Sequence, residues 1–162
     1  MKSVTLHYSE PLIRRAVRAF WLRATGWTFF TATGVLLGSL IALLAAGDTS
    51  WFVGLIGAVF LLAVGFAGAL YFVHLRASLT RFHRMQVPEA TLELGEETFR
   101  LVADAGTSEL AWRTITQIWR FSDFWLVFLS PAQFLTLPLA DLDEESREIL
   151  LRNARIHRAK IK

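Results

Sequence analysis

The sequence contains no cysteine and only four prolines among its 162 residues. The lack of cysteine excludes disulfides, thiolate metal ligands and a cysteine nucleophile, and it is compatible with a reducing environment. Charge is also missing from two long segments. From Trp27 to Gly47 no side chain is ionisable, and from Trp51 to Leu75 the only titratable group is His74. Segments of this composition need an apolar surrounding.

The two uncharged segments are long enough to cross a membrane. They hold about 21 and about 25 residues, and at about 1.5 Å per helical residue each exceeds a hydrocarbon layer about 30 Å thick. Helices buried in a soluble bundle would need a polar face, and neither segment has one. A cleaved signal peptide fits poorly, because about 25 residues precede the first segment and its apolar run is too long. We therefore predict a transmembrane helical hairpin at residues 27–75.

Basic residues predict the orientation of this hairpin. Four arginines precede the first span, three follow the second, and the turn Gly47–Ser50 carries only Asp48 (the arginines are Arg14, Arg15, Arg18, Arg23, Arg76, Arg81 and Arg84). Positive residues near span ends are retained in the cytoplasm, so we expect a multi-pass protein with both termini cytoplasmic. Residues 89–162 carry twelve acidic against nine basic side chains. Basic residues are therefore in excess only beside the spans, where they suit membrane lipid headgroups. This distribution does not indicate a nucleic-acid partner.

Residues 1–26 predict one strand and one amphipathic helix. Val4, Leu6 and Tyr8 alternate with polar residues, and we expect this strand at the edge of a sheet encoded after residue 89. Ser9 and Pro11 then favour a helix start. An apolar stripe lies opposite the arginines (Leu12, Ile13, Ala16, Val17, Phe20 and Trp21). This helix either lies in the headgroup layer or packs its apolar face on the β domain.

Small residues recur in the predicted spans at a spacing that lets helices pack closely. They are Gly34, Gly38 and Ala42 in the first span, and Gly54, Ala58, Gly65 and Ala69 in the second. Such ridges join the two spans to each other or to a second copy in a homo-oligomer. No charged side chain lies deep in either span, which disfavours a transporter or an ion channel.

Beyond the hairpin the hydrophobic period changes. Residues 76–88 continue the second helix until Pro88. Six strand-like runs follow (residues 91–94, 99–103, 108–112, 118–121, 125–129 and 134–137), which predict an antiparallel meander. A helix is expected from about Asp141, with an apolar stripe that closes one end of the bent sheet (Leu142, Ile149, Leu150 and Ile156). The fold class is therefore a membrane α+β protein with a β domain at residues 89–162.

One group of residues in the β domain resembles a known family. It runs through Leu110, Ala111 and Trp112, then Ile115, Ile118 and Trp119, and on to Phe128, Leu129, Ser130, Pro131, Phe134, Leu137 and Pro138. These residues and the layout of strand, helix, two spans and β domain resemble YcxB-like bacterial membrane proteins. The resemblance implies a pleckstrin-homology-like domain on the cytoplasmic face of the bacterial inner membrane. It carries over no catalytic residue.

The candidate binding residues lie within and beside this motif. Trp112, Ile115, Ile118 and Trp119 are expected to fill the core. Arg113, Trp119, Arg120, Phe124 and Trp125 form a hypothetical recognition surface for a peptide or lipid headgroup, because aromatic residues and arginine are enriched in binding hot spots. Burial of both Phe124 and Trp125 would remove most of this surface.

Signatures of catalysis are missing. The histidines His7, His74, His83 and His157 are isolated, and the carboxylates of residues 141–148 suit a helix N-terminus in water. We expect no catalytic, cofactor-binding or metal-ligating residue, and hence no enzyme. Two functions stay open: a membrane-anchored binding or adaptor module for a protein or lipid headgroup, and an immunity or inhibitor protein that sequesters a toxin. A structural role through self-association is third.

Overall fold

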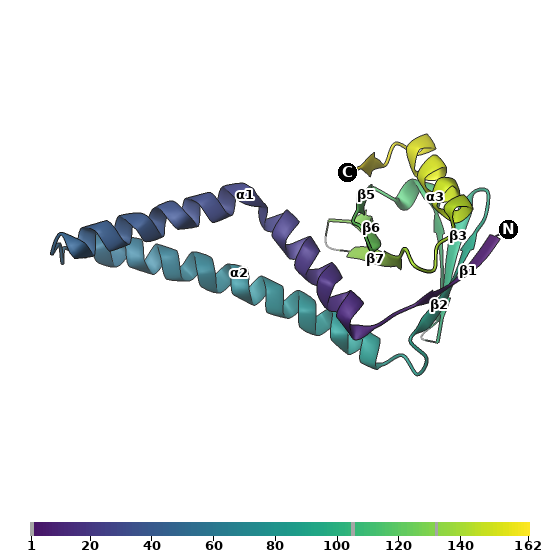
Figure 1. The fold of residues 1–162 in the computed structure, drawn as a ribbon, viewed down its shortest axis with the longest axis horizontal. Helices are drawn as coiled ribbons and strands as arrows, with labels where there is room; N and C mark the ends of the chain where they lie inside the picture. The colour runs from purple at the N-terminus through teal and green to yellow at the C-terminus, as the bar shows by residue number, and fades with distance from the viewer. Residues whose placement is uncertain (1, 105, 132) are drawn as a thin grey trace. The chain divides into compact units, whose positions relative to one another are not determined.

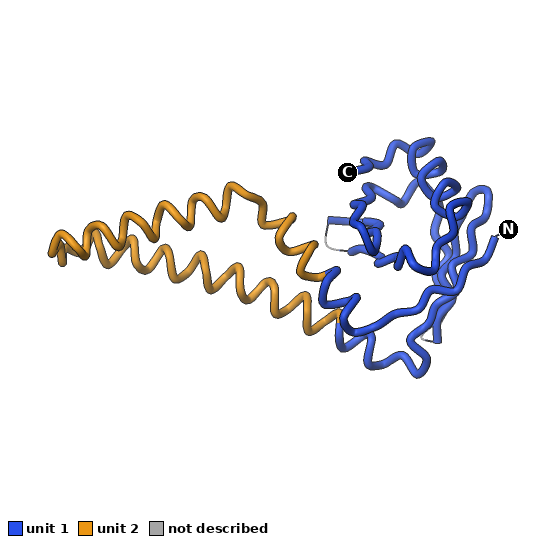
Figure 2. Tube along the Cα trace, viewed as in Figure 1, with its two compact units in different colours: residues 1–16, 79–162 blue, residues 17–78 orange. Residues whose placement is uncertain are grey.

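The computed structural model describes residues 2–104, 106–131 and 133–162. The chain forms two compact units (Figure 2): residues 1–16 with 79–162 make one, and residues 17–78 make the other. The first and last parts of the chain share a unit because the N-terminal strand β1 pairs with strand β2, which follows the helices. The domain boundaries expected from sequence, at residues 26, 75 and 88, followed composition and divided the chain into consecutive segments, although the pairing itself was expected.

Two long helices account for residues 10–83. Helix α1 spans Glu10–Ala45 and helix α2 spans Trp51–His83, with the turn at the predicted Gly47–Ser50 between them (Figure 1). Both are long and apolar enough to cross a membrane. Helix α2 continues past Leu75, as its sequence predicts. Helix α1 includes the predicted amphipathic segment and is interrupted at Gly26, whose φ of 73° and ψ of 157° are not helical.

The contact between the two helices involves larger side chains than the glycines and alanines expected from the sequence. Thr33, Leu36, Leu40 and Leu43 are half-buried at a spacing of three and four, which is the spacing of a helix–helix seam. On α2, Val53 and Ala67 are buried. A Cβ added at Gly57 would lie 3.9 Å from Leu40 Cδ1. The seam is therefore built from Leu and Thr on α1 against small and medium residues on α2.

The first sheet has four antiparallel strands in the order β1-β2-β3-β4. Their bounds are Lys2–His7, Glu89–Leu94, Thr98–Ala103 and Gly106–Ala111. Val4 lies opposite Leu92, and Leu92 lies opposite Leu101. The prediction that the N-terminal strand joins the edge of the C-terminal sheet is confirmed.

The second sheet has the order β7-β6-β5-β8. Strand β5 spans Gln117–Arg120, β6 spans Phe124–Ser130, β7 spans Gln133–Pro138 and β8 spans Lys160–Ile161. The expected single meander is wrong, because the 3-10 turn η1 at Trp112–Thr114 separates the strands into two sheets. The parallel pairing of β8 with β5 was also missed, since a two-residue strand carries no detectable alternation.

Helix α3 spans Glu144–Ile156, and its N-cap Asp143 accepts a hydrogen bond from the Ser146 backbone N–H at 3.0 Å. It packs against β2, η1 and β8. Leu142 and Leu150 are buried, but Ile156 is 66% exposed, so the predicted apolar stripe ends before it. Ile156 lies in the last turn, beyond the sheets that the helix covers.

Both sheets and α3 share one hydrophobic core, which includes Leu92, Trp112, Ile118 and Leu150. Trp112 is fully buried, and its indole N–H donates to the Gly95 carbonyl at 3.2 Å. Gly95 is required at this turn, because a Cβ there would lie 2.8 Å from the Thr98 carbonyl oxygen. The prediction that the motif residues fill the core is confirmed for Trp112, Ile115 and Ile118, whereas Trp119 is buried outside this core, against Phe128.

Candidate functional site

The predicted aromatic recognition surface is not exposed. Trp119, Phe124 and Trp125 are only 7%, 5% and 4% accessible, whereas Arg113 and Arg120 are exposed. The error arises from β6, whose first five residues are all buried rather than alternating. Trp119 packs on Phe128 with ring centroids 4.5 Å apart, and Phe128 packs on Phe134, so aromatic residues cover the second face of this sheet. Of the predicted surface, the two arginines remain accessible.

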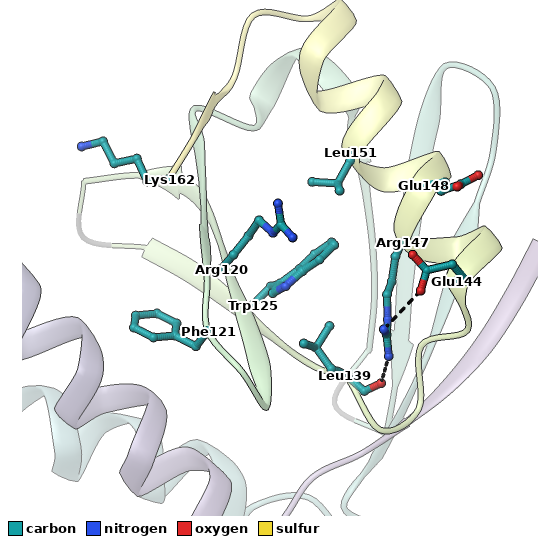
Figure 3. Close-up of a pocket in the computed structure, with 9 residues that line it drawn as sticks. All are labelled: Arg120, Phe121, Trp125, Leu139, Glu144, Arg147, Glu148, Leu151 and Lys162. Atoms are coloured by element: carbon teal, nitrogen blue, oxygen red, sulfur yellow. Dashed lines mark hydrogen bonds and ion pairs between the residues drawn. The ribbon is translucent and has the colours of Figure 1, made fainter.

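One of these arginines lines a pocket of about 510 Å³ in the unit that contains the sheets. The pocket lies between the β5–β6 hairpin and helix α3, with contributions from the segments after β7 and β8 (Figure 3). Its lining combines three cations, two carboxylates and four apolar side chains (Arg120, Arg147 and Lys162; Glu144 and Glu148; Phe121, Trp125, Leu139 and Leu151). We refer to it as the Arg120 pocket.

Strand pairing places Arg120 in this pocket. Arg120 and Trp125 are direct partners across the β5–β6 hairpin, and the Arg120 guanidinium carbon lies 5.5 Å from the centroid of the Trp125 ring. This distance is typical of a cation–π contact. Trp125 belongs to the hydrophobic core, so its ring is held rigidly beneath the guanidinium. Among the described residues, no carboxylate lies within ion-pair distance of Arg120 or of Lys162.

Arg147 enters the same pocket from helix α3. Its Nη2 donates to the Leu139 carbonyl at 2.6 Å, and its Nη1 lies 3.4 Å from a Glu144 carboxylate oxygen (Figure 3). Its Nε is buried and has no hydrogen-bond partner. A buried donor without a partner carries a desolvation cost.

A second pocket of the same unit, about 680 Å³, is lined by residues that include Lys2, Glu145 and Ile149. Its lining holds two cations, Lys2 and Arg152, and one of them is already neutralised, because the Lys2 ammonium pairs with the carboxylates of Asp143 and Glu145. The hydrogen bond from Lys2 is the main cause that lowers the pKa of Asp143 to about 2. This pocket therefore presents less unpaired charge than the Arg120 pocket does.

The small residues singled out from the sequence do not form the helix–helix seam. A Cβ added at Gly34, Gly38, Gly54 or Gly65 would meet nothing within 4 Å, and Ala42, Ala58 and Ala69 are exposed. The expectation that these residues join α1 to α2 within one chain is wrong. The seam is formed by the residues described above, which include the small residues Gly57 and Ala67 on α2.

Sequence reasoning found Arg120 and Trp125 but missed the rest of the Arg120 pocket. Arg147 and Lys162 lie about 27 and 42 residues further along the chain, and no local pattern links them to the hairpin. Among the residues that the structure describes, no group of three or more His, Cys, Asp or Glu side chains is placed to hold a metal ion.

Fold and comparison together define the kind of protein. It is an α+β protein with two long apolar helices and a two-sheet unit closed by a C-terminal helix. Residues 94–152 match the model of the family described as YcxB-like protein, and the resemblance drawn from the motif residues is confirmed over this segment. Comparison with curated proteins and with solved structures gives no match.

Proposed function

We propose that the protein is a membrane-anchored binding module. Helices α1 and α2 span the bilayer, and large apolar side chains along them support this, for example Leu61, Leu62 and Phe66, which are 69%, 73% and 67% exposed. In water each would cost about 25 cal/mol per Å² of apolar surface, whereas in lipid the cost disappears. The arginines that precede the first apolar segment and those that follow residue 75 support a cytoplasmic location for both termini at the bacterial inner membrane.

The two sheets and α3 form, on this proposal, the pleckstrin-homology-like domain that the family resemblance implies. The order of two successive sheets, antiparallel except for the β5–β8 pair, with a packed helix after β7 supports this part of the proposal. The domain has a binding role and no catalytic one.

The observation that carries the binding role is the Arg120 pocket. Two cations there have no carboxylate partner among the described residues, a third has a buried N–H without an acceptor, and a core tryptophan holds one guanidinium in place. An anionic group of the ligand is the partner that this arrangement lacks. Arginine suits phosphate and carboxylate through its planar set of donors. The ligand is therefore an acidic group, either a lipid phosphate or a carboxylate of a partner protein.

A binding measurement on the full chain in detergent tests this proposal. The Arg120→Gln variant removes the charge held over Trp125, and Arg113→Gln is its matched control, because Arg113 is exposed and does not line the pocket. Two probes are titrated: a soluble short-chain phosphatidylglycerol and a fluorescent acidic peptide. Charge-assisted hydrogen bonds contribute about 1.5–3 kcal/mol, so we expect Arg120→Gln to weaken one probe by about 10-fold to 150-fold.

The two probes separate the two ligand sources, and the Arg113→Gln variant should bind as the unchanged chain does. Weakening that is equal in both variants would indicate general electrostatic attraction and would contradict a site at Arg120. Failure of both probes to bind would do the same. Retention of the protein in the membrane fraction after alkaline extraction tests the anchoring part independently.

A further inference from the structure

A second cavity lies within the helical unit and has a different chemistry. It has a volume of about 280 Å³ and is lined mainly by apolar side chains (Phe20, Trp21, Ala24, Thr25, Phe29, Phe66, Ala67, Leu70 and His74). All of these residues belong to the unit of residues 17–78. We refer to this cavity as the Gly26 cavity, because its lining on α1 lies on both sides of that residue.

The cavity exists because α1 is not straight. Gly26 combines a φ of 73° with a ψ of 157°, a region that is essentially restricted to glycine. The helix changes direction there, so Phe20 and Trp21 before it and Phe29 after it do not form one continuous face. On α2 the lining residues recur as 66, 67, 70 and 74, which is one face of a helix. The cavity is the space left between this face and the bend.

Specific contacts fix the position of the two cavity walls relative to each other. The Trp21 indole N–H donates to the Ala67 carbonyl at 2.9 Å. The Trp21 ring contacts Tyr71 edge to face with centroids 5.7 Å apart, and Phe20 contacts His74 in the same way at 5.3 Å. These contacts bridge α1 and α2 at the level of the cavity. The walls are therefore fixed by interactions other than mutual packing of the side chains that face the space.

The depth of the cavity can be estimated from helix length. From Trp27 to Ala45, α1 runs about 19 residues, or about 28 Å, which is close to the hydrocarbon thickness of a bilayer. On α2, the distance from Trp51 to Ala67 is about 25 Å by the same rise. With the turn at one surface of the bilayer, the cavity lies where acyl chains begin beneath the opposite headgroups.

The chemistry of the cavity disfavours two occupants. Buried water needs two to four polar partners, but the indole N–H is already bonded to Ala67, and the lining offers only Thr25 and His74 as further polar side chains. A helix from a second copy is about 10–12 Å across with its side chains, which is too wide for a cavity of about 280 Å³. An acyl chain is narrow, flexible and present at this depth, and it restores the dispersion contacts that an empty cavity loses.

We propose that the Gly26 cavity binds one acyl chain of a membrane phospholipid. This inference rests on the membrane insertion proposed above and is independent of the Arg120 pocket. The bend and the Trp21–Ala67 hydrogen bond keep the site open, so the lipid is held more tightly than the lipids that surround the rest of the hairpin.

Native mass spectrometry of the full chain after extraction into mild detergent tests this proposal. The Ala24→Phe variant fills the cavity from an exposed position on α1, and Ala69→Phe is the matched control, because Ala69 is exposed on α2 and does not line the cavity. The unchanged chain and Ala69→Phe should each retain one phospholipid per chain. Ala24→Phe should lose it. Equal retention by Ala24→Phe, or release of all lipid from the folded unchanged chain, would overturn the proposal.

A second measurement covers the case in which Ala24→Phe does not fold. Phosphatidylcholine vesicles that carry a diazirine near the carboxyl end of the acyl chain should label the peptide of residues 66–74 in the unchanged chain. This labelling should resist dilution by unlabelled lipid, whereas labelling near Leu61 and Leu62 should fall in proportion. Proportional loss at both places contradicts a bound chain. Absence of the protein from the membrane after alkaline extraction would instead contradict the anchoring proposal.

Discussion

Substitution of Gly26 by alanine should straighten helix α1. An L-residue in the conformation of Gly26 is strained by about 1–3 kcal/mol, and alanine is about 1 kcal/mol more favourable than glycine within a helix. The bent form therefore loses about 2–4 kcal/mol relative to the straight form. The hydrogen bond from Trp21 to Ala67 resists this change, but it contributes only about 0.5–1.5 kcal/mol. Without the contribution of that hydrogen bond, the ratio of bent to straight helix falls by about 30-fold to 900-fold.

Distances between spin labels can measure this change, because the chain has no native cysteine to label by accident. Leu22 before the bend and Leu62 on α2 are both exposed, so cysteines there disturb little packing. The distance from 22 to 62 should change in Gly26→Ala. The distance from Val35, which lies after the bend and is 68% exposed, to Leu62 should not. An unchanged 22-to-62 distance in a folded variant would refute the view that the glycine conformation maintains the bend.

Three further predictions concern stability. The carboxylate of Asp143, whose pKa is lowered to about 2, stabilises the fold fully above about pH 4, and this contribution is lost as the pH falls towards 2. Denaturation midpoints of the Asp143→Ala variant should therefore differ from those of the unchanged chain at pH 6 and converge with them at low pH. The Asp143→Asn variant keeps the helix cap and loses only the pair with Lys2. Gly57→Leu should lower the thermal midpoint of the helical unit in detergent because Leu40 lies opposite, whereas Gly38→Leu, with nothing within 4 Å, should not; equal effects would contradict the seam. Trp112→Ala should lower the free energy of unfolding by about 3–5 kcal/mol in urea titrations, and a loss below about 1 kcal/mol would contradict its place in the core.

The strands of the β domain were predictable because their period is local. Alternation placed the six strands of residues 89–138 within a few residues of their observed ends, and the alternation of Val4, Leu6 and Tyr8 correctly predicted that the first strand joins the sheet. The division into two sheets was not predictable in the same way. It depends on η1 and on the parallel pairing of β8 with β5, which joins residues about 43 positions apart.

The candidate site shows the same limit. Arginines and aromatics near residue 120 were recognisable as a cluster, but their exposure was not. Trp119 is buried because it packs on Phe128 on the face of the second sheet that alternation would leave in water, whereas Trp125 is buried in the core. Arg120 stays accessible, and helix α3 brings Arg147 to the same pocket.

The amino-acid sequence by itself determined the two apolar helices, the turn between them and the motif of the YcxB-like domain, because length, absence of charge and local spacing suffice for each. Tertiary structure alone decided which residues form the helix seam, which aromatics are buried, and that a bend at Gly26 leaves a cavity. These features depend on pairs of residues distant in the chain and on a backbone conformation that glycine permits but does not require.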